Sequence, residues 1–403
     1  MKKIKSLATK QSVLFLGVYF LVFGVSFATF SWATSKRDTS IVSPMSQEEP
    51  QSKAGIMNFS GPKDQECPIN GEMFTKEQAQ VWGKRRPLLV MIENHKNARP
   101  QSGLSRADVV YEAIAEGGIT RFMGVYYCRA ALPAEKPYDV GPVRSARTYF
   151  LDWASEYSRY PLYNHVGGAH CSPLPGGGCA TYPKAQALEQ IDQYGWLDSS
   201  NHSDMNQFAL SYKQCRREPK RTGESRAVEH TMYCDTASLW KLADKRGLSG
   251  WDKENFTAWQ FKDDDSGQVG ASKIGFDFWD GFKNYHVTWN YDAQSSSYSR
   301  ENGGVAHLDF LTNKPLKAKV VVVQFVKETG PVDPLKHMLY QTVDEGKALV
   351  FQDGGVTKGT WEKAKRTART RFYDSKGKEI KFNRGKIWIE ALPRGNKVNY
   401  ESQ

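Results

Sequence analysis

The sequence lacks the short motifs that identify the commonest catalytic centres. It contains no G-x-S-x-G nucleophile elbow, no H-E-x-x-H zinc motif and no glycine-rich phosphate loop. Whether the protein is an enzyme is left open by these absences.

Acidic residues are missing from the first 37 positions, which hold six of the 55 lysines and arginines. The net charge of +11 over the whole chain therefore falls to +5 in the remainder, where 49 basic residues face 44 acidic ones. A mildly basic body suits weak attraction to anionic polymers or lipid headgroups. It disfavours nucleic acid as a partner.

Charge of either sign is missing from residues 13–33. This apolar run matches the roughly 20 residues that a helix needs to cross a bilayer. The run is longer than the apolar region of about 7–15 residues in a cleavable signal peptide, and no clean A-x-A cleavage site follows it. Both observations favour an uncleaved anchor, and a cleaved secretory signal is the alternative. Four lysines precede the run and only Lys36 and Arg37 follow it closely. The positive-inside rule then predicts a single-pass protein of the cell membrane, with a cytoplasmic tail at 1–11, a transmembrane anchor at 12–34 and an extracytoplasmic body.

Cysteine is absent until Cys67, so no lipoprotein cleavage site follows the apolar run. The body then contains six cysteines, an even number that predicts disulfide bonds in an exported protein. Short loops favour Cys171–Cys179 and Cys215–Cys234, which leaves Cys67–Cys128. The alternative is a metal site formed with His165 and His170, but these spacings do not match the compact pairs of structural zinc sites. We predict no metal and no cofactor.

Composition divides the body into a tether and two domains. Residues 35–83 are predicted to be a flexible tether, because most of this segment is rich in Ser, Pro and charge without apolar periodicity. Residues 84–262 alternate strand-like and helix-like patterns, and residues 263–272 have the composition of a linker. Residues 273–394 form a β-rich meander that includes the continuous apolar run 318–326, typical of a strand covered on both faces. The expected fold class is α/β (α+β), with a mixed N-terminal domain and a β-rich C-terminal one.

The most informative stretch is a predicted hairpin. Residues 109–114 form one strand, Gly117-Gly118 the turn and residues 119–127 the partner strand. In a regular hairpin Glu116 pairs with Ile119, Glu112 with Met123, and Arg121 lies opposite Ile114 on the face of both glutamates. A cation between two carboxylates is either a structural ion-pair lattice or a ligand site.

Two further arginines are three residues apart. If a helix begins after Pro142, Arg144 and Arg147 share a face beside its N-terminal dipole, where they would suit a phosphate or carboxylate. The competing interpretation is that they neutralise the hairpin glutamates. The candidate ligand-binding residues are Arg99, Glu112, Glu116, Arg121, Arg144, Arg147 and His165.

The spacing of the two hairpin glutamates argues against their acting as a catalytic pair. Glu112 and Glu116 would lie roughly 13 Å apart on one strand. That distance exceeds the separation of about 5–9.5 Å between paired glycosidase carboxylates. Asp139 is a candidate partner for His165 as a base. No catalytic residue is assigned.

Several blocks resemble the YerB-like family of exported bacterial proteins, a family with a domain of unknown function. The most specific blocks are EGGITR at Glu116–Arg121 and GPVRSAR at Gly141–Arg147; the His165 bend and Trp388 also fit. The resemblance covers most of residues 84–394 and implies an N-terminal α/β domain followed by a C-terminal β-rich domain. Members are typically lipoproteins, whereas this chain lacks the lipobox cysteine, so a peptide anchor would replace the lipid.

We therefore expect a membrane-anchored envelope protein that binds cell-wall glycan or a wall-active partner protein. The alternative is a hydrolase or transferase acting on an anionic wall or lipid-linked substrate, and a scaffold for wall-synthesis proteins is a third class. An exposed line of aromatic residues in the second domain would favour glycan binding, although most are expected to form core pairs. These aromatic residues are Trp279, Tyr285, Trp289, Tyr291, Tyr298, Trp361 and Trp388.

Overall fold

The computed structural model describes residues 61–130, 138–199, 202–251, 253, 256–265 and 270–401. These residues belong to one compact unit of the chain, which spans residues 56–403. The predicted cytoplasmic tail, the membrane segment and residues 35–60 of the tether lie outside the described residues. The prediction of a flexible tether is wrong for residues 61–83, because they form two short strands and a helix, with apolar side chains, Trp82 among them, buried in the core. Within the described ranges, every helix is too short or too polar to cross a bilayer.

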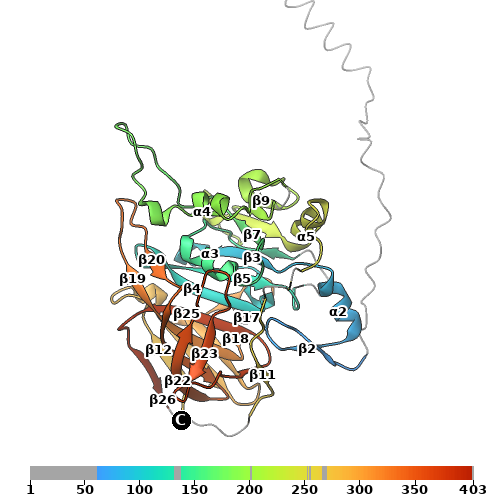
Figure 1. Ribbon diagram of the computed structural model, residues 1–403. Helices are drawn as coiled ribbons and strands as arrows, with labels where there is room; N and C mark the ends of the chain where they lie inside the picture. Colours follow the sequence, from blue (N-terminus) through green and yellow to red (C-terminus); the bar gives the residue numbers. More distant parts are fainter. Residues whose placement is uncertain are drawn as a thin grey trace, which may run out of the picture. The chain divides into compact units, whose positions relative to one another are not determined.

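One large sheet runs through both halves of the chain (Figure 1). Its strands, in spatial order, are β23 (Arg371–Asp374), β22 (Gly355–Glu362), β21 (Glu345–Gln352), β19 (Val320–Thr329), β25 (Ile387–Pro393), β4 (Val109–Glu116), β5 (Ile119–Tyr126), β3 (Leu88–Glu93), β7 (Leu162–His165) and β8 (Asp204–Asn206), with β20 (Leu339–Gln341) paired to β19. The two halves join where β25 pairs in parallel with both β19 and β4. Residues 320–323 of β19 are fully buried, which confirms a strand covered on both faces.

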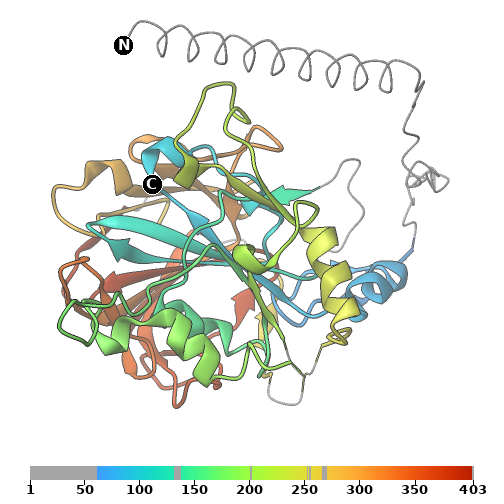
Figure 2. The same cartoon turned by 90° about the horizontal axis from the view of Figure 1, so that it is seen from above.

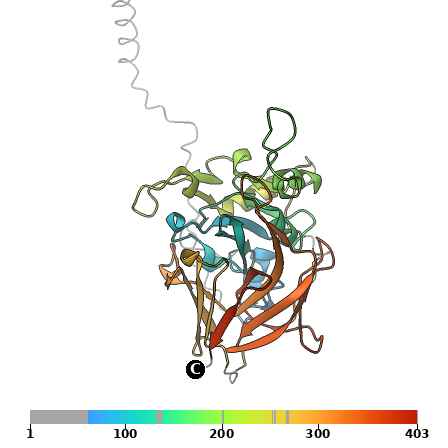
Figure 3. The same cartoon turned by 90° about the vertical axis from the view of Figure 1, so that its left-hand side faces the viewer.

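A second sheet is built from the C-terminal half alone. Its order is β15 (Val305–Ala306), β14 (Ser297–Asn302), β13 (Val287–Asp292), β12 (Lys273–Phe276) and β26 (Val398–Glu401), with β18 (Lys317–Ala318) also paired to β14. In Figure 3 these yellow-orange strands face the red and orange strands of the large sheet. Trp289 of β13 packs edge-on against Trp388 of β25 with ring centroids 5.3 Å apart, so the core lies between the sheets.

Short strand pairs complete the β structure. They are β1 (Gln65–Glu66) with β2 (Met73–Phe74), β6 (Asp139–Val140) with β10 (Met232–Asp235) and β9 (Cys215–Arg217), β11 (Phe261–Lys262) with β24 (Phe382–Asn383), and β16 (Leu308–Asp309) with β17 (Lys314–Pro315).

Four described α-helices lie in the N-terminal half. They are α2 (Lys76–Gly83), α3 (Thr148–Ala154), α4 (Ala187–Gln193) and α5 (Thr236–Lys245). Short 3₁₀ turns occupy Lys96–Ala98, Leu104–Arg106, Pro183–Ala185, Gln207–Ala209, Val228–His230 and Lys283–Tyr285. Seen from above, α2 and α5 lie on the same side of the fold (Figure 2). The helices therefore cover the N-terminal part of the large sheet, and the mixed α/β class with a β-rich C-terminal part is confirmed.

Local sequence signals explain several of these boundaries. Asp235 accepts a hydrogen bond from the amide of Ser238 and caps α5, as its position before the helix predicts. Gly117 and Gly118 have φ angles of 55° and 77°, which a two-residue hairpin turn requires and which glycine adopts without steric cost.

Three disulfide bonds connect all six cysteines: Cys67–Cys128, Cys171–Cys179 and Cys215–Cys234. The predicted pairing is confirmed. Because disulfides persist in oxidising compartments, this feature agrees with a body that lies outside the cytoplasm.

Candidate functional site

A β-bulge in the hairpin separates the two predicted site glutamates. Glu116 does pair with Ile119, but Glu112 lies opposite Phe122 and Arg121 lies opposite Ala113, because the register shifts between Ile114 and Glu116. The predicted pairing of Glu112 with Met123 and of Arg121 with Ile114 is therefore wrong. One extra residue reverses the side-chain alternation, so Glu116 shares a face with Arg121 while Glu112 points to the other face.

The helix-side face of the sheet carries an arginine–glutamate cluster. The Glu116 carboxylate accepts hydrogen bonds from Nη2 of Arg121 at 3.0 Å and from Nη2 of Arg147 at 2.5 Å. Nη1 of Arg121 donates to the carbonyl of Ser145. Burial alone would raise the pKa of Glu116, but the charges of Arg121 and Arg147 outweigh it and hold this pKa well below its ordinary value. Glu116 is therefore ionised and shared by two cations.

Arg144 extends the cluster toward the surface. Its Nε lies 3.3 Å from Oε1 of Glu93, and the side chain of Arg144 remains 27% exposed. The second oxygen of Glu93 lies 2.9 Å from Nδ1 of His230, whose ring stacks on His95 at 4.7 Å. Across the described ranges, Glu93 is the one ion-pair partner of Arg144. Within those ranges the contact of Arg144 with Glu93 is made through Nε, which leaves the two terminal nitrogens of the guanidinium to meet an anion. We call Glu93, Glu116, Arg121, Arg144 and Arg147 the arginine cluster.

The predicted helix after Pro142 does not form. The segment is extended, with Val143 bridged to Ile92 and Ala146 bridged to Gly168, and α3 begins only at Thr148. Arg147 occupies the position before the helix, with extended backbone angles. The arginines therefore meet different carboxylates, Arg144 meeting Glu93 and Arg147 meeting Glu116, because strand pairing overrides the helix-start signal of a proline.

The opposite face of the hairpin carries a buried polar network. Glu112 is fully buried and accepts hydrogen bonds from the hydroxyl of Thr120 at 2.6 Å and from Nη2 of Arg300 at 2.5 Å. Asn94 donates to the same carboxylate at 3.2 Å. Burial on this scale closes Glu112 to a substrate, so this part of the predicted site is a structural lattice between the two sheets.

Glu390 is the register partner of Glu112 on the neighbouring parallel strand. Burial, followed by the charge of Glu112, raises the pKa of Glu390 well above its ordinary value. Glu390 therefore holds the proton and accepts a hydrogen bond from Trp289 at 3.0 Å, while Nη2 of Arg300 lies 2.5 Å from the carboxyl group of Glu112.

His307 belongs to the same lattice. Nη1 of Arg300 donates to Nδ1 of His307 at 2.8 Å, so the other ring nitrogen carries the proton that is donated to Gln101. Burial, with the nearby charge of Arg300, lowers the pKa of His307 well below its ordinary value. The neutral imidazole is thus a packed core residue.

Arg99 links the network to the surface. It donates to the side-chain oxygen of Asn94 at 3.0 Å and to the carbonyl of Asn284 at 2.9 Å, and it lies over the ring of Tyr285. Burial and the charge of Arg300 lower the pKa of Arg99 to about 10. The contacts of Arg99 hold the two halves together, and within the described residues Arg99 makes no ion pair with the arginine cluster.

His165 is buried and turned toward Asp204. Its Nε2 lies 2.7 Å from the Asp204 carboxylate and its Nδ1 lies 2.6 Å from the carbonyl of Gly167. Asp139 instead pairs with Arg216 at 2.6 Å, so the predicted Asp139–His165 pair is wrong. The Asp204 partner was missed because it lies on a strand that contacts β7 only through tertiary pairing.

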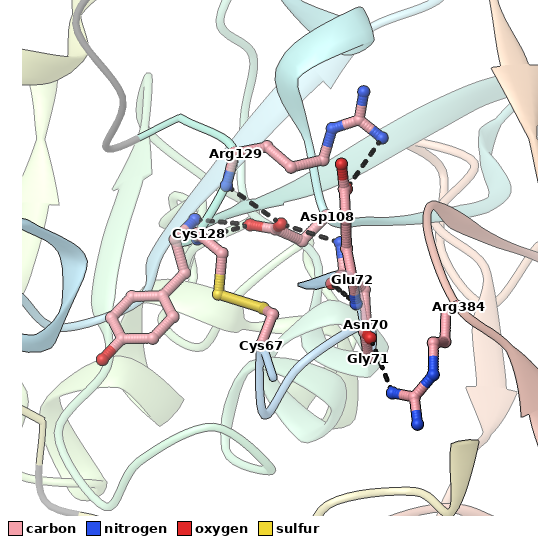
Figure 4. The surroundings of a disulfide bond; sticks show 9 residues. Cys67, Asn70, Gly71, Glu72, Asp108, Cys128, Arg129 and Arg384 are labelled. Atoms are coloured by element: carbon pink, nitrogen blue, oxygen red, sulfur yellow. Dashed lines mark hydrogen bonds and ion pairs between the residues drawn. A yellow bond between two sulfur atoms is a disulfide. The ribbon is translucent and has the colours of Figure 1, made fainter. Parts of the chain in front are cut away.

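A further buried carboxylate lies beside a disulfide (Figure 4). Asp108 accepts hydrogen bonds from the amides of Tyr127 and Cys128 and from the side chain of Asn70. Burial raises the pKa of Asp108 to about 7. Asp108, Cys67 and Cys128 have metal-ligand spacing, but the two sulfurs are bonded to one another, so the group anchors the end of β5.

Five of the seven aromatic residues named for the second domain lie in the core, and Trp279 and Tyr291 are partly buried. Trp289, Tyr298, Trp361 and Trp388 are fully buried, and Tyr285 is nearly so. They do not form an exposed platform for sugars, and the expectation of core pairs holds for these five.

Comparisons with known proteins agree with the architecture. Residues 73–249 match the N-terminal domain, and residues 278–389 the C-terminal domain, of a family described as a protein of unknown function, DUF3048. The chain is 29% identical over 319 residues to the Bacillus subtilis protein named "Putative lipoprotein YerB", an alignment that covers 77% of this chain and 82% of that protein. The crystal structure of the YerB protein from Bacillus subtilis superposes with a TM-score of 0.64 at 25% identity, covering 83% of this chain and 99% of that chain.

Proposed function

The chain belongs to the YerB-like family, and from that premise we propose that it is a membrane-anchored, extracytoplasmic envelope protein that binds acidic cell-wall glycan. A wall-active protein is the competing partner. Support for the location comes from the three disulfides, from the uncharged run at residues 13–33 and from the description of its Bacillus subtilis relative as a lipoprotein.

The observation that carries the proposal is the unequal charge of the arginine cluster. Three guanidinium groups, those of Arg121, Arg144 and Arg147, face the two carboxylates of Glu93 and Glu116. Within the cluster one positive charge is therefore left over, and it lies at the surface, where Arg144 is partly exposed and the charge of the exposed Glu229 acts on it from outside the cluster. A guanidinium with free terminal nitrogens suits a carboxylate or phosphate of a wall polymer.

Binding is favoured over catalysis by the geometry of the acids. Glu112 is fully buried and Glu116 is held between two arginines. Burial closes Glu112 to a substrate, and the lowered pKa of Glu116 keeps that carboxylate from carrying a proton. The proposal therefore assigns to the cluster recognition of charge, without a chemical step.

The experiment is a pelleting assay of the full-length protein, in detergent, with purified cell walls. One set of walls is intact and the other is stripped of phosphodiester polymers, so that carboxylate and phosphate ligands are distinguished. Arg144→Ala should lower retention about tenfold, because a hydrogen bond to a charged group contributes roughly 1.5–3 kcal/mol. Retention should also fall with added salt.

The matched control is Arg371→Ala. Arg371 is also 27% exposed and also ion-paired, to Glu379. Its removal should leave retention unchanged. Equal retention of wild type and both variants, or binding to a membrane protein in place of the wall, would contradict the glycan proposal.

A further inference from the structure

A groove of about 860 Å³ lies between the N-terminal helices and a β-arm of the C-terminal half. The arm consists of residues 327–341, from the end of β19 through β20, and Figure 1 shows β20 beside α3 and α4. Side chains that line the groove include Asp152, Tyr182, Lys184, Gln193, Tyr194 and Lys327. Binding sites commonly form at such junctions between domains.

The walls of this groove are fastened to one another, so its shape is pre-formed. The amide of Tyr182 donates to Asp333 of the arm at 3.0 Å, and Asp333 also pairs with His337 at 2.8 Å. Tyr340 of the arm packs against Tyr149 of α3 with ring centroids 4.9 Å apart. A ligand would therefore meet an ordered surface and lose little affinity to ordering it.

The groove offers one open stacking surface and several hydrogen-bonding groups. The ring of Tyr182 is 41% exposed, whereas Tyr194, at the C-terminal end of α4, is half-buried and already covered by the guanidinium of Arg366 at 3.8 Å from the ring centroid. The side chains of Gln193, Lys184 and Lys327 make no hydrogen bond or ion pair among the described parts of the chain. Tyrosine faces suit the apolar faces of sugar rings, and amide and ammonium groups suit their hydroxyls.

The charged side chains that line the groove determine which kind of saccharide it would bind best. Lys184 and Lys327 supply two positive charges, whereas one oxygen of Asp152 is occupied by the hydroxyl of Thr342 at 2.6 Å. Burial raises the pKa of Asp152 above its ordinary value, and even when Asp152 is ionised two ammonium groups face this single lining carboxylate. The surplus is positive and favours a sugar chain that carries acidic groups.

The groove adjoins the arginine cluster. Glu116 forms a β-bridge with His337 of the arm, and Thr148, which lines the groove, follows Arg147 in the chain. We propose that the groove is a cleft for an acidic saccharide strand, in which the exposed ring of Tyr182 stacks on a sugar ring and Lys184 and Lys327 bind carboxylates. This inference deepens the proposed function and rests on it for the identity of the polymer as wall glycan.

The test is isothermal titration of the full-length protein in detergent with two soluble tetrasaccharides. One is the neutral tetramer of N-acetylglucosamine, and the other is a peptide-free tetramer in which alternate sugars carry a lactyl carboxylate. The carboxylated tetramer should bind about tenfold more tightly, a difference of roughly 1.4 kcal/mol. Lys327→Ala should remove that preference, and Tyr182→Ala should weaken binding of both tetramers.

The matched controls are Lys358→Ala and Tyr212→Ala, which alter an exposed lysine on β22 and a tyrosine that is 75% exposed. Equal effects of Tyr182→Ala and Tyr212→Ala, or equal affinity for the two tetramers, would overturn the assignment of the groove. If neither tetramer binds while intact walls still retain the protein through Arg144, the groove proposal fails and the proposed function stands. If the walls also fail to retain it, both proposals fail.

Discussion

Nη2 of Arg300 lies 2.5 Å from Oε2 of Glu112, although 188 residues separate them in the chain. Both side chains are fully buried. The contact places a cation of the C-terminal half on a carboxylate of the N-terminal half. Burial of the Arg300 charge alone would destabilise the fold, and its pairing with Glu112 compensates that charge and links the two sheets.

Replacement of Arg300 by methionine should therefore destabilise the protein strongly. Removing one partner of a buried ion pair costs about 3–5 kcal/mol, because the remaining charge is left uncompensated. Chemical denaturation of the variant measures this loss. The double variant Arg300→Met with Glu112→Gln should recover part of it, since the stranded charge is gone. A loss below about 1 kcal/mol for Arg300→Met would contradict the network.

The three disulfides should contribute unequally to stability. Cys67–Cys128 closes a loop of 61 residues and Cys171–Cys179 closes one of eight. Loop-closure entropy predicts losses of roughly 4 and 2.5 kcal/mol when each pair is replaced by serine. Denaturation of the two double-serine variants makes the comparison, and non-reducing mass spectrometry verifies the remaining bridges. Equal losses, or a larger loss from the short loop, would count against this ranking.

Lys386 should make stability depend on pH above neutrality. Burial, followed by the charge of Arg129, lowers the pKa of Lys386 to about 7, and its one hydrogen bond goes to the carbonyl of Leu104. Between pH 7 and about 10 the folded protein holds a neutral lysine while the unfolded chain still binds the proton. The unfolded state then binds more protons, so stability rises with pH across this window.

Replacement of Lys386 by methionine removes this slope. The free energy of unfolding of the wild type, relative to Lys386→Met, should increase by about 1.4 kcal/mol per pH unit between pH 7 and 10. Urea titrations at several pH values measure it, with the exposed Lys358→Met as control. If the free energies of unfolding of the wild type and of Lys386→Met change with pH in parallel, Lys386 is charged in the folded protein and this prediction is wrong.

Local chemistry made part of the fold predictable. The turn at Gly117-Gly118 depends on two residues adjacent in sequence, and it was predicted from them. The sequence before α5 offered both Asp235 and Thr236 as caps, and the structure shows that Asp235 is the cap. The disulfide pairing was also predictable, because two of the three loops are short. The membrane anchor at residues 12–34 and the domain boundary at residues 263–272 remain predictions.

The site depended on information that local sequence does not contain. The bulge between Ile114 and Glu116 has no glycine or proline to mark it, yet it decides which face Glu116 occupies. Strand pairing kept the residues after Pro142 extended, so the expected helix was lost. The partner of Glu112 comes from a strand 188 residues away, and no spacing rule connects them.

Retention of the Arg144→Ala variant on purified cell walls tests the central claim most directly. The expected result is about tenfold weaker retention than that of the wild type and of Arg371→Ala, with all three proteins unfolding at the same denaturant concentration. Retention of Arg144→Ala equal to that of the wild type would contradict the claim that the arginine cluster binds the wall.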